Sequence, residues 1–162
     1  TTATTHCGAL RFTFPENKLR RIQIDLARRV GGTAEYQEVE VLGDNAIQGY
    51  IKCTPDGGGW GDGSGNSRYT LFFYATFSKP LVDYGFWTAD IPDGQSRHNK
   101  DIVTEKYQAL LSNAKVVRGV KSMEGKSIGF FSEFATTRGE QVEMKVGISY
   151  VDVERAKKNH MA

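Results

Sequence analysis

The segment "QVEMKVGISYV" (residues 141–151) carries the clearest structural signal in the sequence, because its apolar residues alternate with other residues over ten positions. The apolar positions are Val142, Met144, Val146, Ile148 and Tyr150. Successive side chains of a β-strand point to opposite sides, so this alternation predicts a strand with one buried and one exposed face.

The same alternation recurs earlier in the chain and predicts further strands. It covers residues 10–14, 22–26, 38–41 and 47–53. "GDN" (residues 43–45) predicts a hairpin turn between the last two of these. "TRGE" (residues 137–140) predicts a second hairpin, which would join residues 127–136 to residues 141–151.

Three other segments depart from simple alternation. "SRYTLFFYATFS" (residues 67–78) is apolar on both faces, which is typical of a central strand covered from two sides. Residues 101–114 have helical spacing and predict a short helical insertion. "DVERAKKNHMA" (residues 152–162) predicts the start of a helix, with Asp152 as its N-cap.

These elements together predict a mainly β fold, an antiparallel β-sandwich over residues 1–151. About eight strands separated by turns every 8–12 residues are typical of that architecture. The chain opens on "TTATTHCGAL" rather than on methionine, so we expect its N-terminus to be a cut end.

Composition excludes some classes of function. The 162 residues carry a net charge of +2, which does not favour binding to a phosphate backbone. No apolar run approaches the roughly 20 residues that a transmembrane helix needs. Cys7 and Cys53 form no metal-binding pattern, and the sequence leaves open whether they form a disulfide or remain free thiols.

The glycine-rich segment "GGGWGDGSGN" (residues 57–66) is the most unusual motif. It matches neither phosphate-binding glycine motif, and it precedes a predicted strand, whereas those motifs open a helix. Asp62, Ser64 and Asn66 alternate as oxygen donors, as in a calcium loop, but the glycine and glutamate that such a loop needs are absent. We therefore favour turn capping by Asp62 and Asn66 over calcium binding.

Catalytic signals are weak, which leaves the two tryptophans as candidate binding residues. The three histidines are far apart in the sequence, and no nucleophile motif is present. Exposed aromatic rings beside polar groups stack well on sugars. Trp60 lies among the glycines and fits either sugar stacking or packing, whereas Trp87, next to Phe86, is expected to pack against the sandwich.

Several segments in order resemble the N-terminal region of glycoside hydrolase family 92. They are "TTATTHCGALRFTFPE", "IQIDLARRVGG", "IQGYIKCTPDGGGWGDGSGN", "YTLFFYATFSKP" and "GFFSEFATTRGEQVEMKVGISYVDVERAKKN". The resemblance implies a calcium-dependent, inverting exo-α-mannosidase that acts on N-glycans and is secreted or periplasmic in bacteria. It also implies a β-sandwich joined by a helical linker to an (α/α)6 catalytic barrel.

On this resemblance, residues 1–151 match the later part of the sandwich and residues 152–162 the start of the linker. The catalytic residues and calcium ligands would then lie outside this chain, which we expect to be inactive alone and to contain no metal site. Its partners would be the barrel of its own chain and α-mannoside glycans. We expect Trp60, Asp62, Asn66 and Trp87 to support the substrate pocket or the interface with the barrel.

Two other readings remain open at this stage. The chain would be a standalone carbohydrate-binding module if Trp60 or Trp87 stacked on sugars, or a purely structural domain if neither did. A sandwich that lacks strands has unpaired sheet edges, so we also expect self-association of the isolated fragment.

Overall fold

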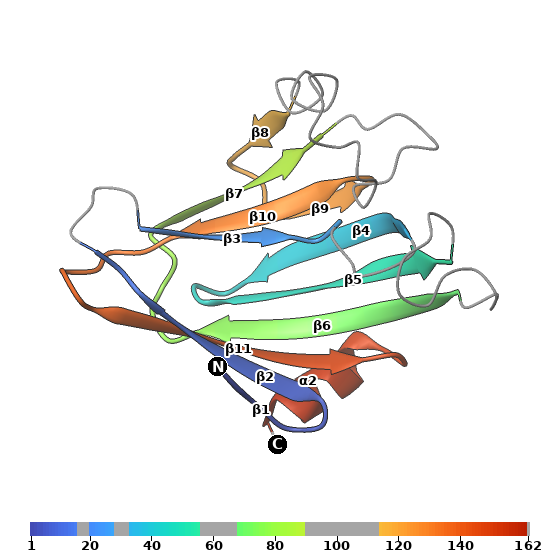
Figure 1. Ribbon diagram of the computed structural model, residues 1–162. Coiled ribbons are helices and arrows are strands. Elements are labelled where there is room, and N and C mark those ends of the chain that lie inside the picture. The colour runs from blue at the N-terminus through green and yellow to red at the C-terminus, as the bar shows by residue number, and fades with distance from the viewer. Residues whose placement is uncertain (16–19, 28–32, 56–67, 90–113, 162) are drawn as a thin grey trace.

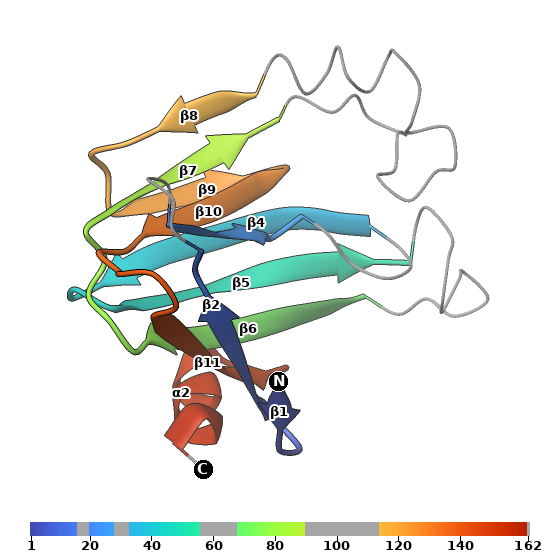
Figure 2. The ribbon, with the colours of Figure 1, turned by 60° about the vertical axis from the view of Figure 1, so that its left-hand side comes forward.

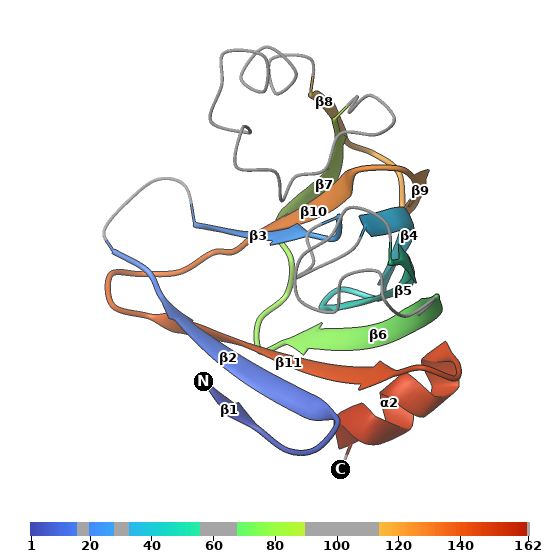
Figure 3. The same cartoon turned by 45° about the vertical axis from the view of Figure 1, so that its right-hand side comes forward.

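The protein is a β-sandwich of two antiparallel sheets with a helix on the outer face of the larger sheet (Figure 1). The computed structural model describes residues 1–15, 20–27, 33–55, 68–89 and 114–161. The turned views show the two sheets facing each other, with helix α2 (Val153–Met161) beside β11 (Figures 2 and 3).

The larger sheet has seven strands in the order β1-β2-β11-β6-β5-β4-β9. Their bounds are Thr2–Ala3 (β1), Cys7–Thr13 (β2), Gln141–Ser149 (β11), Tyr69–Phe77 (β6), Ala46–Thr54 (β5), Thr33–Leu42 (β4) and Ser122–Gly125 (β9). The smaller sheet has four strands in the order β3-β10-β7-β8. Their bounds are Arg21–Asp25 (β3), Ile128–Glu133 (β10), Asp83–Thr88 (β7) and Lys115–Val117 (β8).

The predicted fold class and its main strands are confirmed. The segment from which the prediction began is β11, which pairs with β2 on one side and β6 on the other. The "GDN" turn joins β4 to β5, and Leu42 and Ala46 are the paired residues next to this turn. Gly43 has a φ of 58°, a left-handed conformation that glycine adopts without a Cβ clash.

The second predicted hairpin is wrong. "TRGE" does form a turn, in which the Glu140 amide donates to the Thr137 carbonyl over 3.1 Å. The strands on either side do not pair, because β10 belongs to the smaller sheet and β11 to the larger one. The turn is therefore a crossover between the layers, and turn composition alone does not distinguish a crossover from a hairpin.

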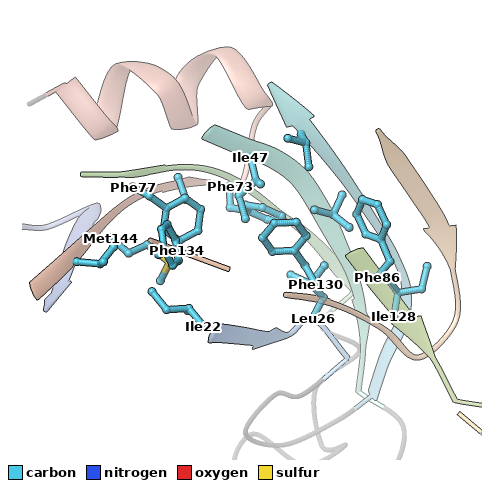
Figure 4. Packing of buried hydrophobic residues seen from close by; sticks show 14 of the residues in the cluster. Ile22, Leu26, Ile47, Phe73, Phe77, Phe86, Ile128, Phe130, Phe134 and Met144 are labelled. Atoms are coloured by element: carbon cyan, nitrogen blue, oxygen red, sulfur yellow. The ribbon is translucent and has the colours of Figure 1, made fainter. Parts of the chain in front are cut away.

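Aromatic and aliphatic side chains from both sheets form the core (Figure 4). Phe77 from the larger sheet lies 5.4 Å from Phe134, and Phe86 lies 5.7 Å from Phe130 within the smaller sheet, measured between ring centroids. Phe77, Phe86 and Phe130 are fully buried. Each fully buried side chain of this size contributes about 1.5–3 kcal/mol to stability.

Strand β6 is the predicted central strand with two covered faces. Phe73, Ala75 and Phe77 face the core and are buried. On the opposite face, the Thr76 hydroxyl lies 2.8 Å from Nε2 of His160, in helix α2.

Helix α2 is capped at its start and hydrogen-bonded to the larger sheet near its end. The predicted N-cap is confirmed, because Asp152 accepts a hydrogen bond from the Arg155 amide over 2.6 Å. Near the other end, the Asn159 side chain donates to the Ile148 carbonyl over 2.7 Å. Gly147 allows this close approach, since a Cβ there would lie 2.5 Å from the His160 nitrogen and 2.7 Å from its Cβ.

The state of the two cysteines and several short elements were not predicted from the sequence. Cys7 and Cys53 are both buried free thiols. Strands β1, β7, β8 and β9 were not predicted, and the helix predicted over residues 101–114 lies almost wholly outside the described residues. None of the helices in the described ranges is long and apolar enough to span a membrane.

We predict that Gly147→Ala destabilises the fold, because the added methyl group pushes the helix backbone away from β11. Overpacking of this kind costs about 1–3 kcal/mol. Urea denaturation would measure the loss. Gly8→Ala is the matched control, because a Cβ on this other strand glycine meets nothing within 4 Å. Equal stability of the two variants would contradict the prediction.

Candidate functional site

Three of the four predicted site residues lie in the glycine-rich segment. Trp60, Asp62 and Asn66 fall within residues 56–67, outside the described residues. The segment joins the end of β5 to the start of β6, two paired neighbours in the larger sheet. Whether these three side chains line a pocket therefore stays a prediction.

Trp87, the fourth predicted residue, packs on the smaller sheet. It lies in β7 directly opposite Gly129 in β10. A Cβ built on Gly129 would overlap the indole ring of Trp87, so the ring lies against the backbone of β10. Trp87 is half-buried. These contacts support packing, the reading that the sequence favoured for this residue.

The outer face of the smaller sheet carries a charged cluster that sequence reasoning missed. The Arg21 and Arg118 guanidinium groups lie 4.4 Å and 4.7 Å from the centroid of the Phe131 ring. Arg21 Nη2 contacts a Glu133 carboxylate oxygen at 2.5 Å. Arg118 pairs with Asp83 and also reaches Glu133. Three strands and the segment after β8 supply these residues, so no short motif reveals them.

Electrostatics keep two carboxylates of the described chain ionised. The hydrogen bond from Arg21, with support from Arg118, lowers the pKa of Glu133. The hydrogen bond from Lys79 and that from the Thr137 amide lower the pKa of Glu140. A carboxyl group with a lowered pKa is a poor proton donor near neutral pH, so neither side chain suits a glycosidase general acid.

An exposed pair of tyrosines lies near the start of helix α2. The Tyr69 and Tyr150 rings meet edge to face, with centroids 5.6 Å apart. Tyr69 is 36% exposed and Tyr150 is 65% exposed. Tyr69 opens β6 and Tyr150 directly follows β11. The alternation of residues 141–151 continues to Tyr150, whereas residues 67–78 are apolar on both faces and carry no signal that singles out Tyr69.

A second aromatic group lies on the outer face of the larger sheet. The Tyr50 and Phe72 ring centroids are 6.1 Å apart. The Lys52 ammonium lies 5.6 Å from the Tyr36 ring and 5.5 Å from the Tyr50 ring. Burial raises the pKa of Tyr50, and its hydrogen bond with Glu38 adds to the shift. The Lys52 side chain therefore lies next to the Tyr36 and Tyr50 rings.

No calcium site is formed by the residues that the structure describes. Within them, His, Cys, Asp and Glu side chains form no group of three that could hold a metal ion. Calcium binding needs six to eight oxygen ligands, several of them carboxylates. The described donor set therefore does not fit the ion.

A comparison with protein families decides the identity of this sandwich. Residues 1–149 match the model of the glycosyl hydrolase family 92 N-terminal domain. The chain belongs to glycosyl hydrolase family 92. A comparison with curated proteins gave no match.

Solved structures of family 92 enzymes have the same fold as this domain. The α-mannosidase BT3965 from Bacteroides thetaiotaomicron, solved alone and with mannoimidazole, has a TM-score of 0.70 at 26% identity. The alignment covers 99% of this chain but 18% of BT3965. The inverting mannosidase BT2199 from the same bacterium has a TM-score of 0.67 at 14% identity, with coverages of 99% and 17%. The chain thus spans less than a fifth of either structure.

The contact between His160 and the sheet makes the docking of helix α2 sensitive to acid. Burial lowers the pKa of His160, and the positive charge of Lys145 on β11 adds to the shift. The Tyr74 ring lies edge-on at 5.1 Å, and the Lys157 ammonium lies 5.7 Å from that ring. Burial and the positive charge of Lys145 thus both oppose protonation of His160.

We predict that stability falls as the pH drops below about 6.5, the ordinary histidine pKa. Between that value and the lower folded-state pKa, the unfolded chain binds a proton that the folded chain does not, so acid favours unfolding. Urea midpoints at pH 7.5 and pH 5.0 would measure the loss. His160→Gln should reduce this pH dependence, whereas His6→Gln, at an exposed position, should not. Identical profiles for both variants would contradict the assignment to His160.

Proposed function

We propose that this chain is the non-catalytic N-terminal sandwich portion of a calcium-dependent, inverting exo-α-mannosidase that acts on the mannose residues of N-glycans. The match of residues 1–149 to the family 92 N-terminal domain carries the proposal. The likeness to BT3965, a family 92 α-mannosidase solved with mannoimidazole, supports the substrate class.

The catalytic groups of the proposed enzyme lie in an (α/α)6 barrel beyond this chain. The small share of BT3965 that the chain covers supports this arrangement, because most of such an enzyme lies elsewhere. Glu133 and Glu140 form ion pairs with Arg21 and Lys79 and are poor proton donors, which also supports a catalytic site outside this chain. The sandwich would then span residues 1–151, and the linker to the barrel would begin at residues 152–162 with α2. The enzyme would be secreted or periplasmic and would bind calcium in the barrel.

The glycine-rich segment is the proposed contribution of this domain to the substrate pocket. Its glycines would let the backbone lie close to the barrel, with Trp60 as the anchor and Asp62 and Asn66 capping turns. Ligand clefts form preferentially at such domain interfaces. Trp87 is assigned to packing because its ring lies on Gly129.

One observation favours a second candidate function, a standalone carbohydrate-binding module. The exposed Tyr69 and Tyr150 rings form an aromatic surface of the kind on which sugars stack. Mannoside binding by a protein that hydrolyses no α-mannoside would favour this candidate.

We predict that the full-length protein releases mannose from an α-linked mannobiose when calcium is present. Removing calcium with a chelator should abolish release, and adding the ion back should restore it. The products would be quantified by chromatography. Absence of release from every α-mannoside tested, with the protein folded and loaded with calcium, would refute the proposed activity.

Substitution of the two tryptophans should separate pocket support from packing. In the full-length enzyme, Trp60→Ala should lower kcat/KM at unchanged thermal stability. Trp87→Ala should lower the thermal midpoint, because it leaves Gly129 uncovered, while the remaining folded enzyme keeps its KM. Thermal unfolding and steady-state kinetics would be measured on both variants. Loss of stability without loss of activity in Trp60→Ala would refute its role at the interface.

A further inference from the structure

The Trp87 ring packs on the smaller sheet through only one of its two faces. Three adjacent ring atoms, Cε2, Cζ2 and Cη2, are about equally close to the position that a Cβ on Gly129 would take. An edge-on ring would hold at least one of these atoms much farther away, so the indole lies flat over the backbone of β10. Its other face therefore points away from the sheet, and the side chain is only half-buried.

Phe131 lies on the same outer face in a similar arrangement, but its ring is covered. The ring packs against Gly85, the glycine opposite it in β7. The Arg21 and Arg118 guanidinium groups lie over the ring, and Phe131 is 2% exposed. No cationic group of the described residues lies over Trp87 in this way. Of these two rings, Trp87 is thus the one with an open face.

A carboxylate and an exposed apolar side chain flank the Trp87 ring. Gly129 is opposite Asp25 in β3, and Trp87 is opposite Val116 in β8, so these side chains share the outer face. Asp25 and Val116 are both exposed. Asp25 Oδ1 accepts a hydrogen bond from the Ala27 amide over 3.0 Å, and a carboxylate can accept several more. A molecule stacked on the ring above Gly129 would lie within reach of this carboxylate.

We propose that the open face of the Trp87 ring, with the Asp25 carboxylate beside it, binds a pyranose unit of a mannose-containing glycan. A pyranose has an apolar C–H face and hydroxyl groups around its rim. The C–H face matches a flat indole, and the rim hydroxyls donate hydrogen bonds of the kind that a carboxylate accepts. An aromatic ligand would offer the carboxylate no such donors. The choice of mannose as the sugar rests on the proposed function.

Position 23 offers a way to cover the ring without removing it. Arg21 lies over the Phe131 ring from a position two residues along β3 from Gln23, the residue opposite Phe131. Gln23 has the same diagonal relation to Gly129, over which the Trp87 ring lies. Gln23→Arg should therefore place a guanidinium over the open face of the indole. Gln23→Ala, at the same exposed position, leaves that face open and is the matched control.

Affinity electrophoresis of the full-length protein in gels that contain α-mannan measures the binding, with calcium chelated so that the polymer stays intact. We expect the wild-type protein and Gln23→Ala to be retarded, and Gln23→Arg to bind about tenfold more weakly, as for the loss of one stacked ring. Thermal midpoints of the three proteins should be similar, because Trp87 keeps its contact with Gly129. Absence of wild-type retardation, or equal retardation of the two variants, would overturn the proposal.

Two further variants test the carboxylate and the location of the site. Asp25→Asn keeps an acceptor for the Ala27 amide and should weaken retardation, whereas unchanged retardation would overturn the part of the carboxylate. Retardation lost in Tyr150→Ala but kept in Gln23→Arg would assign mannan binding to the tyrosine pair and overturn the proposal. Mannose release is a separate readout. Release without this binding contradicts only the site at Trp87, and binding without release contradicts only the proposed activity.

Discussion

The packing of β6 on both faces, one buried in the core and one half-buried, is the constraint on which the rest of the structure depends. Its core-facing residues, Phe73, Ala75 and Phe77, pack beneath the smaller sheet. Its opposite face carries Thr76 and Tyr74, which contact His160 of helix α2. A strand apolar on both sides needs a packed layer on each face, which the smaller sheet and helix α2 provide for β6, while β5 and β11 pair with its two edges.

The position of β6 also determines where helix α2 can lie. The helix follows β11 immediately, and β11 is the direct neighbour of β6. The missing side chain at Gly147 lets the helix backbone approach the sheet, and Asn159 and His160 then hydrogen-bond to β11 and β6. Because these contacts are polar and directional, they set the direction of the helix more strictly than apolar packing alone would.

Alternation predicted the strands whose apolar side chains lie on one face, toward the core, and it predicted little else. Residues 141–151 and 47–53 are such segments, and both strands form where expected. Strand β7 was missed because Gly85 and Phe86 are both buried, so its pattern does not alternate. The layer change at "TRGE" was missed because pairing is decided by contacts with β2, β3, β6 and β7, which are distant in sequence. The Asp152 cap was predictable because capping is local.

The contacts of the candidate site residues also join segments that are distant in the sequence, so local patterns did not predict them. The Trp87 ring packs on Gly129, which lies opposite it in the sheet but far from it in the sequence. The cluster around Phe131 likewise combines residues from β3, β7, β10 and the segment after β8. Its four charged groups, Arg21, Arg118, Asp83 and Glu133, balance in pairs, and the cluster has no unpaired carboxylate with which to transfer a proton. The charged groups of this cluster thus pair with one another and cover the Phe131 ring on the outer face of the smaller sheet.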